Sequence, residues 1–76
     1  AALRLRPDSL TFLNERARLL RIMKKPELAI ADCSAAIKIA SPQKQITFLN
    51  MRAVLLVGLN RLDEAVADYN RSISIE

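Results

Sequence analysis

The stretch TFLNERARLL at residues 11–20 returns as TFLNMRAVLL at residues 47–56, and PELAIAD at 26–32 returns as LDEAVAD at 62–68. The same offset of 36 residues separates both pairs. Self-similarity with a period of roughly 20 to 50 residues is typical of stacked repeat arrays, in which each unit buries its apolar face against a neighbour. The sequence therefore predicts one structural unit that occurs twice.

Signals for helix starts occur at four places along the chain. They are caps, first-turn prolines or first-turn acidic residues, namely Ser9, Pro26, Pro42 and Asp63-Glu64. We also expect Lys24 and Lys25 in the last turn of the first helix, where cations suit the carbonyl end of the helix dipole. Four helices of about 12 to 17 residues follow from these signals and from the apolar periodicity. They form two helical hairpins.

Apolar residues at helical spacing predict the buried side of each helix. The four expected stripes are Leu13, Ala17, Leu20 and Met23; then Ala29, Cys33, Ala36, Ile37 and Ile39; then Ile46, Leu49, Ala53, Leu56 and Leu59; and finally Ala65, Tyr69, Ser72, Ile73 and Ile75. Two phenylalanines and one tyrosine are the only aromatic residues. The core must therefore be built mainly from aliphatic side chains, which favours helices.

The small residues at matching places in the two units resemble the tetratricopeptide repeat. Its pattern places a small residue in the first helix, here Ala17 and Ala53, and an alanine in the second, here Ala29 and Ala65. Residues 61–75, RLDEAVADYNRSISI, are especially similar to the second helix of this family. The resemblance implies an all-α, right-handed α-solenoid of antiparallel helical hairpins.

The resemblance also suggests how the chain is divided. We expect a single domain over residues 1–76, in which 1–8 are the tail of a preceding repeat, 9–41 the first full repeat and 42–76 the second. Arrays of this kind usually contain at least about three repeats. The chain is therefore expected to be part of a longer array.

Arginine stands twice where the family has leucine. Arg16 is followed by Asp32, and Arg52 is followed by Asp68, at the same spacing. These residues are predicted to form structural ion pairs within or between hairpins. The alternative is that the arginines bind a ligand.

Catalytic chemistry is not expected from this sequence. The chain has no histidine, a single cysteine, Cys33, and no glycine-rich phosphate loop. The usual nucleophile, general-base and metal constellations are therefore missing, and we predict no catalytic residue, no metal site, no cofactor and no enzyme activity. Cys33 is predicted to be a small buried hydrophobe.

In the resembled family the first helix of each hairpin lines a concave groove, where a partner peptide or helix docks. The implied groove residues are Asn14, Glu15, Arg18 and Arg21 from the first repeat, and Asn50, Met51, Val54 and Val57 from the second. The first set is polar and largely basic, and the second set is mostly apolar. We therefore expect a non-enzymatic protein-interaction module or scaffold whose partner carries acidic and apolar residues.

Two qualifications apply to this groove. One subgroup of the family clamps the acidic C-terminal tails of chaperones, but Glu15, Thr47 and Met51 stand where that clamp needs Asn, Lys and Arg, so we predict no such clamp. The apolar half could instead be covered by a neighbouring repeat, a capping helix or a second copy of the chain.

Two alternative functions remain open at the level of sequence. Helical-hairpin repeats of another type bind single-stranded RNA, and residues 1–25 carry a net charge of +5, although residues 26–76 carry −1, which disfavours nucleic acid. A purely architectural segment that self-associates through uncapped ends is the other alternative. No apolar run long enough for a membrane span and no signal pattern occur, so a soluble cytoplasmic protein is the default expectation.

Overall fold

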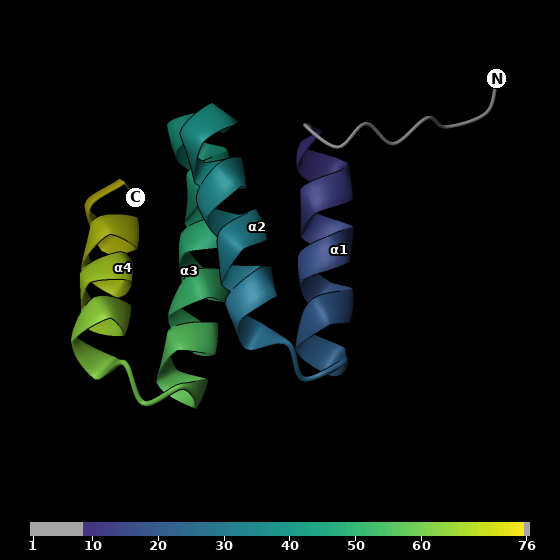
Figure 1. Ribbon diagram of the computed structural model, residues 1–76. Helices are drawn as coiled ribbons and strands as arrows, with labels where there is room; N and C mark the ends of the chain where they lie inside the picture. The colour runs from purple at the N-terminus through teal and green to yellow at the C-terminus, as the bar shows by residue number, and fades with distance from the viewer. Residues whose placement is uncertain (1–8, 76) are drawn as a thin grey trace, which may run out of the picture.

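The computed structural model describes residues 9–75, and they fold into four helices. These are α1 (Leu10–Ile22), α2 (Pro26–Ile39), α3 (Pro42–Gly58) and α4 (Leu62–Ile75), and no strand occurs within the described range (Figure 1). The predicted all-α fold is confirmed. The expected tail of a preceding repeat, residues 1–8, lies outside the described residues.

The first turns of α1 and α3 are fixed in different ways. The Ser9 hydroxyl accepts a hydrogen bond of 3.0 Å from the Phe12 amide, which satisfies one of the free donors at the start of α1. At α3 the Gln45 side chain donates to the carbonyls of Ile37 and Ala40, at 2.8 and 3.3 Å. This side chain therefore ties the start of α3 to the end of α2.

The turns between α1 and α2 and between α3 and α4 have the same geometry. Lys24 and Asn60 both adopt a left-handed backbone with φ of 62°. In each turn the amide of the following residue donates 2.8 Å back to a carbonyl in the last turn of the helix. This is a Schellman-type helix ending.

The prediction that Lys24 and Lys25 lie in the last turn of the first helix is wrong. α1 ends at Ile22, and Met23 is its C-cap residue. The left-handed backbone at Lys24 turns the chain out of the helix, and both lysines therefore lie in the connection to α2.

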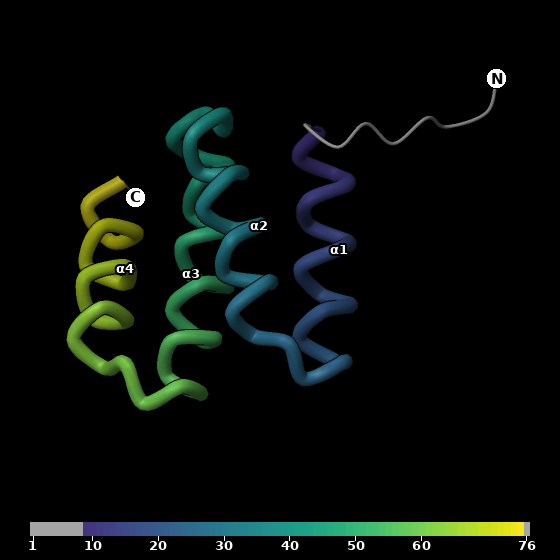
Figure 2. The backbone as a smooth tube through the Cα atoms, viewed as in Figure 1, coloured from purple at the N-terminus to yellow at the C-terminus, as the bar shows by residue number. Residues whose placement is uncertain are grey.

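The helices form a zigzag in which each packs against the next one along the chain (Figures 1 and 2). α1 and α3 run in one direction, and α2 and α4 run in the other (Figure 2). The main buried cluster joins α1, α2 and α3 and consists of Leu13, Ala17, Ala29, Cys33, Ala36, Phe48 and Leu55. A second cluster joins α3 to α4 through Ala53, Leu56 and Ala65. The small residues at both crossings allow the helices to approach closely.

The predicted stripes identify most of this core, with errors in each of the four. Four side chains expected to be buried are exposed, namely Met23, Ile39, Tyr69 and Ile73. Met23 lies beyond the last residue of α1, as its C-cap. Phe48 and Leu55 are absent from the expected α3 stripe, yet both are buried. α3 packs against α2 as well as α4, so more than one stripe of this helix is covered.

Candidate functional site

The first helices of the two hairpins, α1 and α3, share two surface hollows. One lies near their N-terminal ends and has a volume of about 250 Å³. We name it the polar hollow, and its lining consists of Leu10, Thr11, Asn14, Lys44, Thr47 and Phe48. Two hydroxyls, an amide and an ammonium group supply donors and acceptors here. Such a lining can hold the backbone of an extended peptide.

The second hollow lies near the C-terminal ends of α1 and α3 and is larger, at about 440 Å³. We name it the aliphatic hollow, and it is lined by Arg21, Lys24, Pro26, Val54, Leu55 and Gly58. Two cations stand beside an apolar floor, and the lining contains no carboxylate. An aliphatic side chain next to an acidic group is the ligand chemistry that such a surface fits.

Gly58 keeps the aliphatic hollow open. A Cβ atom added at this residue would meet nothing within 4 Å, and the residue does not adopt a left-handed backbone. Neither packing nor backbone conformation therefore requires glycine at this position. Its missing side chain leaves space at the surface of the hollow.

The structure brings together only some of the predicted groove residues. Asn14 lines the polar hollow, whereas Arg21 and Val54 line the aliphatic hollow. The remaining five predicted residues line neither of these hollows, and they are Glu15, Arg18, Asn50, Met51 and Val57.

Three of those five have identifiable surroundings. Glu15 and Arg18 form an exposed ion pair of 3.5 Å on the surface of α1. Met51 is half-buried and packs against the main core cluster. Its side chain is therefore committed to the interior and less available to a partner.

Two cations of the hollows are absent from the predicted groove set. Lys44 lies one turn before Thr47, so helical periodicity from Thr47 could have identified it. Lys24 could not be found in this way, because its position depends on the left-handed turn after α1. Both lysines add positive charge to the face between α1 and α3.

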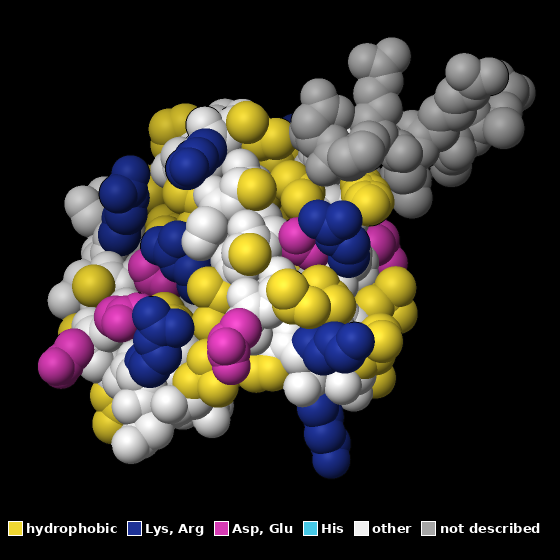
Figure 3. All heavy atoms as spheres, viewed as in Figure 1, with side chains coloured by type: hydrophobic (Ala, Val, Ile, Leu, Met, Phe, Trp, Pro, Cys, Tyr) yellow, Lys and Arg dark blue, Asp and Glu magenta, His cyan; other side chains and the backbone are white. Residues whose placement is uncertain are grey.

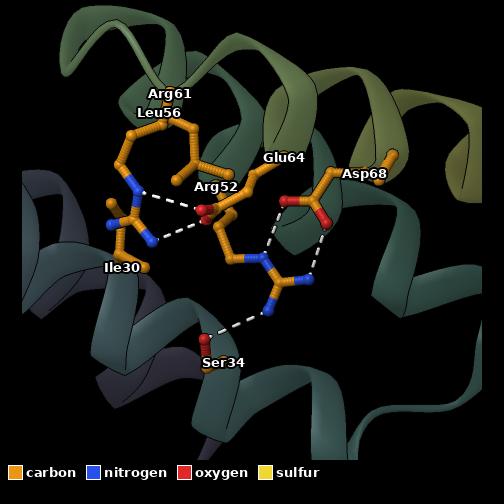
Figure 4. Close-up of a pocket in the computed structure, with 8 residues that line it drawn as sticks. Ile30, Ser34, Arg52, Leu56, Arg61, Glu64 and Asp68 are labelled. Carbon is orange, nitrogen blue, oxygen red and sulfur yellow. Dashed lines mark hydrogen bonds and ion pairs between the residues drawn. The ribbon is translucent and has the colours of Figure 1, made fainter.

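The predicted arginine and aspartate partners lie in contact in both hairpins. Arg52 Nε and Nη2 donate to the two oxygens of Asp68, at 2.7 and 2.6 Å, and Nη1 donates to the Ser34 hydroxyl at 3.1 Å (Figure 4). Asp68 is only 6% exposed. The bidentate bond raises the pKa of Arg52. Arg52 therefore links α3 to both α4 and α2.

Arg16 makes the equivalent bidentate contact to Asp32, at 2.8 and 2.6 Å. The hydrogen bond to Asp32 raises the pKa of Arg16, and the guanidinium carbon lies 4.8 Å from the centre of the Phe12 ring. The Arg16 side chain is 48% exposed, twice as much as the 24% of Arg52. Arg16 therefore has the same aspartate contact as Arg52 but is more exposed to solvent.

Cys33 lies in the middle of the core cluster. Burial raises the pKa of its thiol to about 11, so the reactive thiolate is disfavoured near neutral pH. Among residues 9–75 no group of three or more metal-ligating side chains comes together. Within the same range, no helix has the length and apolarity needed to cross a bilayer.

Comparison with known proteins agrees with the repeat pattern. Residues 46–76 match the family model of the tetratricopeptide repeat. Neither the curated proteins nor the solved structures gave a match to the chain. Repeats of this family are generally non-enzymatic protein-interaction modules. The matched segment takes in most of α3 and α4, so the second hairpin is a tetratricopeptide repeat, and α1 and α2 form an equivalent hairpin before it.

Proposed function

We propose that the chain is a protein-interaction module that binds an extended peptide along the face between α1 and α3. Residues 9–41 and 42–76 act as two repeats that share this binding face. The polar hollow holds the peptide backbone, and the aliphatic hollow receives one aliphatic side chain. Arg21 and Lys24 contact a carboxylate beside that side chain. The partner is therefore a protein segment with neighbouring apolar and acidic residues.

The observation that carries this proposal is the composition of the aliphatic hollow. Arg21 and Lys24 stand beside Val54 and Leu55, and no carboxylate in the lining neutralises them. Val54 is 47% exposed, so its apolar surface is available to a ligand. Burying such surface is favourable, and the adjacent cations select for an acidic neighbour.

The test uses two short labelled peptides that differ only in charge. One carries a leucine flanked by two glutamates, and the other carries the same leucine flanked by two glutamines. We expect the glutamate peptide to bind on the order of tenfold more tightly, because charge-assisted hydrogen bonds to Arg21 and Lys24 are lost in the glutamine peptide. Fluorescence polarisation measures both affinities.

Two variants connect this affinity to the aliphatic hollow. Gly58→Leu fills the hollow without a steric clash at Cβ, and it should weaken both peptides while the fold is retained. Arg21→Gln should remove the preference for the glutamate peptide. If neither variant changes binding, or if the glutamine peptide binds equally well, the groove proposal is wrong.

The RNA alternative is an outcome of the same experiment. A labelled single-stranded RNA that binds more tightly than either peptide, with an affinity that falls steeply with salt, would favour nucleic acid instead. We expect only weak RNA binding, because the cations of the groove are few and lie next to apolar side chains.

A further inference from the structure

Four polar side chains converge on the polar hollow without a hydrogen-bond partner of their own. They are Thr11 and Asn14 of α1 and Lys44 and Thr47 of α3. None of the side-chain hydrogen bonds and ion pairs formed within residues 9–75 uses any of these four. Their donor groups are therefore available to a ligand that enters the hollow.

The polar hollow also carries a positive charge that its own lining does not offset. Lys44 supplies this charge, and the lining contains no acidic residue. On the face of the molecule drawn in Figure 3, by contrast, basic side chains lie beside acidic ones. Arg52 and Arg61, for example, each contact a carboxylate at 2.6 Å. The polar hollow therefore offers its cation to an anion from outside.

The direction of the helices distinguishes the polar hollow from the aliphatic hollow. Thr11 and Lys44 lie in the first turns of α1 and α3, where the helix dipole adds partial positive charge. Ser41, the N-cap residue of α3, makes no side-chain capping bond that would offset this charge. At the aliphatic hollow the C-terminal ends of the same helices oppose the charge of Arg21 and Lys24. The more highly charged anion is therefore expected at the polar hollow.

The kinds of donor in the polar hollow fit a phosphate group better than a carboxylate. A phosphate monoester carries a charge of about −2 and three acceptor oxygens, which point in different directions. A carboxylate has a single charge and two oxygens in one plane. The three phosphate oxygens can therefore reach the hydroxyls of both α1 and α3 and the Lys44 ammonium at the same time. Leu10 and Phe48 offer apolar contacts to the carbon atoms that carry the phosphate.

We propose that the polar hollow binds a phosphorylated serine or threonine of the partner segment. This inference rests on the proposed function, because the segment lies along the same face between α1 and α3. Lys44 and the hydroxyls of Thr11 and Thr47 bind the phosphate oxygens, while Asn14 holds the peptide backbone beside them. The partner is thus a phosphoprotein, and its affinity for the chain depends on its phosphorylation.

The distance between the two hollows sets the spacing within the partner sequence. Thr11 of the polar hollow and Arg21 of the aliphatic hollow are ten residues apart on α1, which is about 15 Å along the helix axis. An extended peptide covers about 3.3 Å per residue. The phosphorylated residue should therefore stand about four or five residues from the aliphatic residue that enters the aliphatic hollow.

The test extends the labelled glutamate peptide by a phosphoserine about five residues from its leucine. The extension is made in either direction, and otherwise identical peptides carry serine or glutamate at the same place. In one of the two directions the phosphoserine peptide should bind on the order of tenfold more tightly than the serine peptide, with glutamate giving only a small part of this gain. A phosphoserine directly beside the leucine should give little gain, because it cannot reach the polar hollow. Fluorescence polarisation measures the affinities.

Variants of the chain connect this gain to the polar hollow. Lys44→Gln should bring the ratio of the phosphoserine and serine affinities close to one, and Thr47→Val, which removes a hydroxyl at nearly constant shape, should lower the ratio several-fold. Lys38→Gln is the matched control, since this exposed lysine of α2 lines neither hollow and its loss changes the net charge equally. It should leave the ratio unchanged. Any effect of a variant on folding or on backbone binding cancels in the ratio, because both peptides meet the same chain.

The phosphate site and the groove proposal can fail separately. The groove proposal fails if the original glutamate peptide does not bind, whereas the phosphate site fails if that peptide binds but phosphoserine adds nothing. Titration with free phosphoserine, followed by amide chemical shifts, tests the polar hollow alone: the Lys44 and Thr47 amides should move, and Lys44→Gln should suppress the changes. The phosphate site is refuted if these amides do not move, if glutamate fully replaces phosphoserine, or if Lys38→Gln lowers the ratio as much as Lys44→Gln does.

Discussion

Arg52 and Arg16 have the same local sequence and the same aspartate partner, but they differ in how many neighbours complete their environment. Arg52 makes three hydrogen bonds, one of them to Ser34 of the preceding hairpin. Arg16 makes two and is twice as exposed. A buried ion pair is expensive to break because its partner is left charged and unpaired, whereas an exposed pair is largely compensated by water.

Arg52→Ala should therefore lower the free energy of unfolding more than Arg16→Ala does. For Arg52 the expected loss is about 2–3 kcal/mol, because Asp68 is left buried without its cation. For Arg16 the loss should be clearly smaller. Urea denaturation of both variants measures this difference, and an equal or larger loss for Arg16→Ala would contradict a structural role that depends on burial.

Burial of the Cys33 thiol should make the free energy of unfolding fall at alkaline pH. Burial raises its pKa from 9.0 to about 11, so the folded chain keeps a proton that the unfolded chain releases between these pH values. Stability from this group is therefore complete below about pH 9 and is lost as the pH rises towards 11, by about 1–2 kcal/mol. Cys33→Ala should lose less stability than the unaltered chain between about pH 8 and about pH 10.5. An equal loss in both chains would exclude this contribution.

At the scale of the helices, the sequence predicts their number and type better than their ends and faces. Prolines and caps identify the starts, and the repeat itself doubles the evidence for each hairpin. The end of α1 is missed because nothing in the sequence marks Lys24 as the left-handed residue, a place where glycine or asparagine is more usual. The equivalent residue of the second hairpin, Asn60, is of a type that is more usual at this place.

Glycine substitutions at Lys24 and Asn60 should stabilise the two turns to different degrees. Both Lys24 and Asn60 have φ of 62°, but only asparagine tolerates this conformation readily. Lys24→Gly should therefore stabilise the chain by about 0.5–1 kcal/mol, and Asn60→Gly should do so less. Thermal unfolding of both variants tests this ranking. A larger gain from Asn60→Gly would show that backbone strain does not limit the α1–α2 turn.

At the scale of the whole molecule, periodicity alone cannot predict which faces are covered. α3 is covered by helices on two sides, so Phe48 and Leu55 are buried although they lie off its predicted stripe. Ile73 fits the expected stripe of α4 but faces outwards, because no described helix packs on that side. The partial success of the groove prediction has a similar cause. Helical spacing identifies Asn14, Arg21 and Val54, but only the packed hairpins show that Met51 is engaged in the core.

The most direct test of the groove is a map of amide chemical-shift changes in the chain during titration with the glutamate peptide. The largest changes should fall on residues that line the two hollows of α1 and α3, including Asn14, Arg21 and Val54, and Gly58→Leu should suppress those at the aliphatic hollow. Changes confined to α2 and α4, with the α1 and α3 amides unmoved, would contradict peptide binding between the first helices of the two repeats.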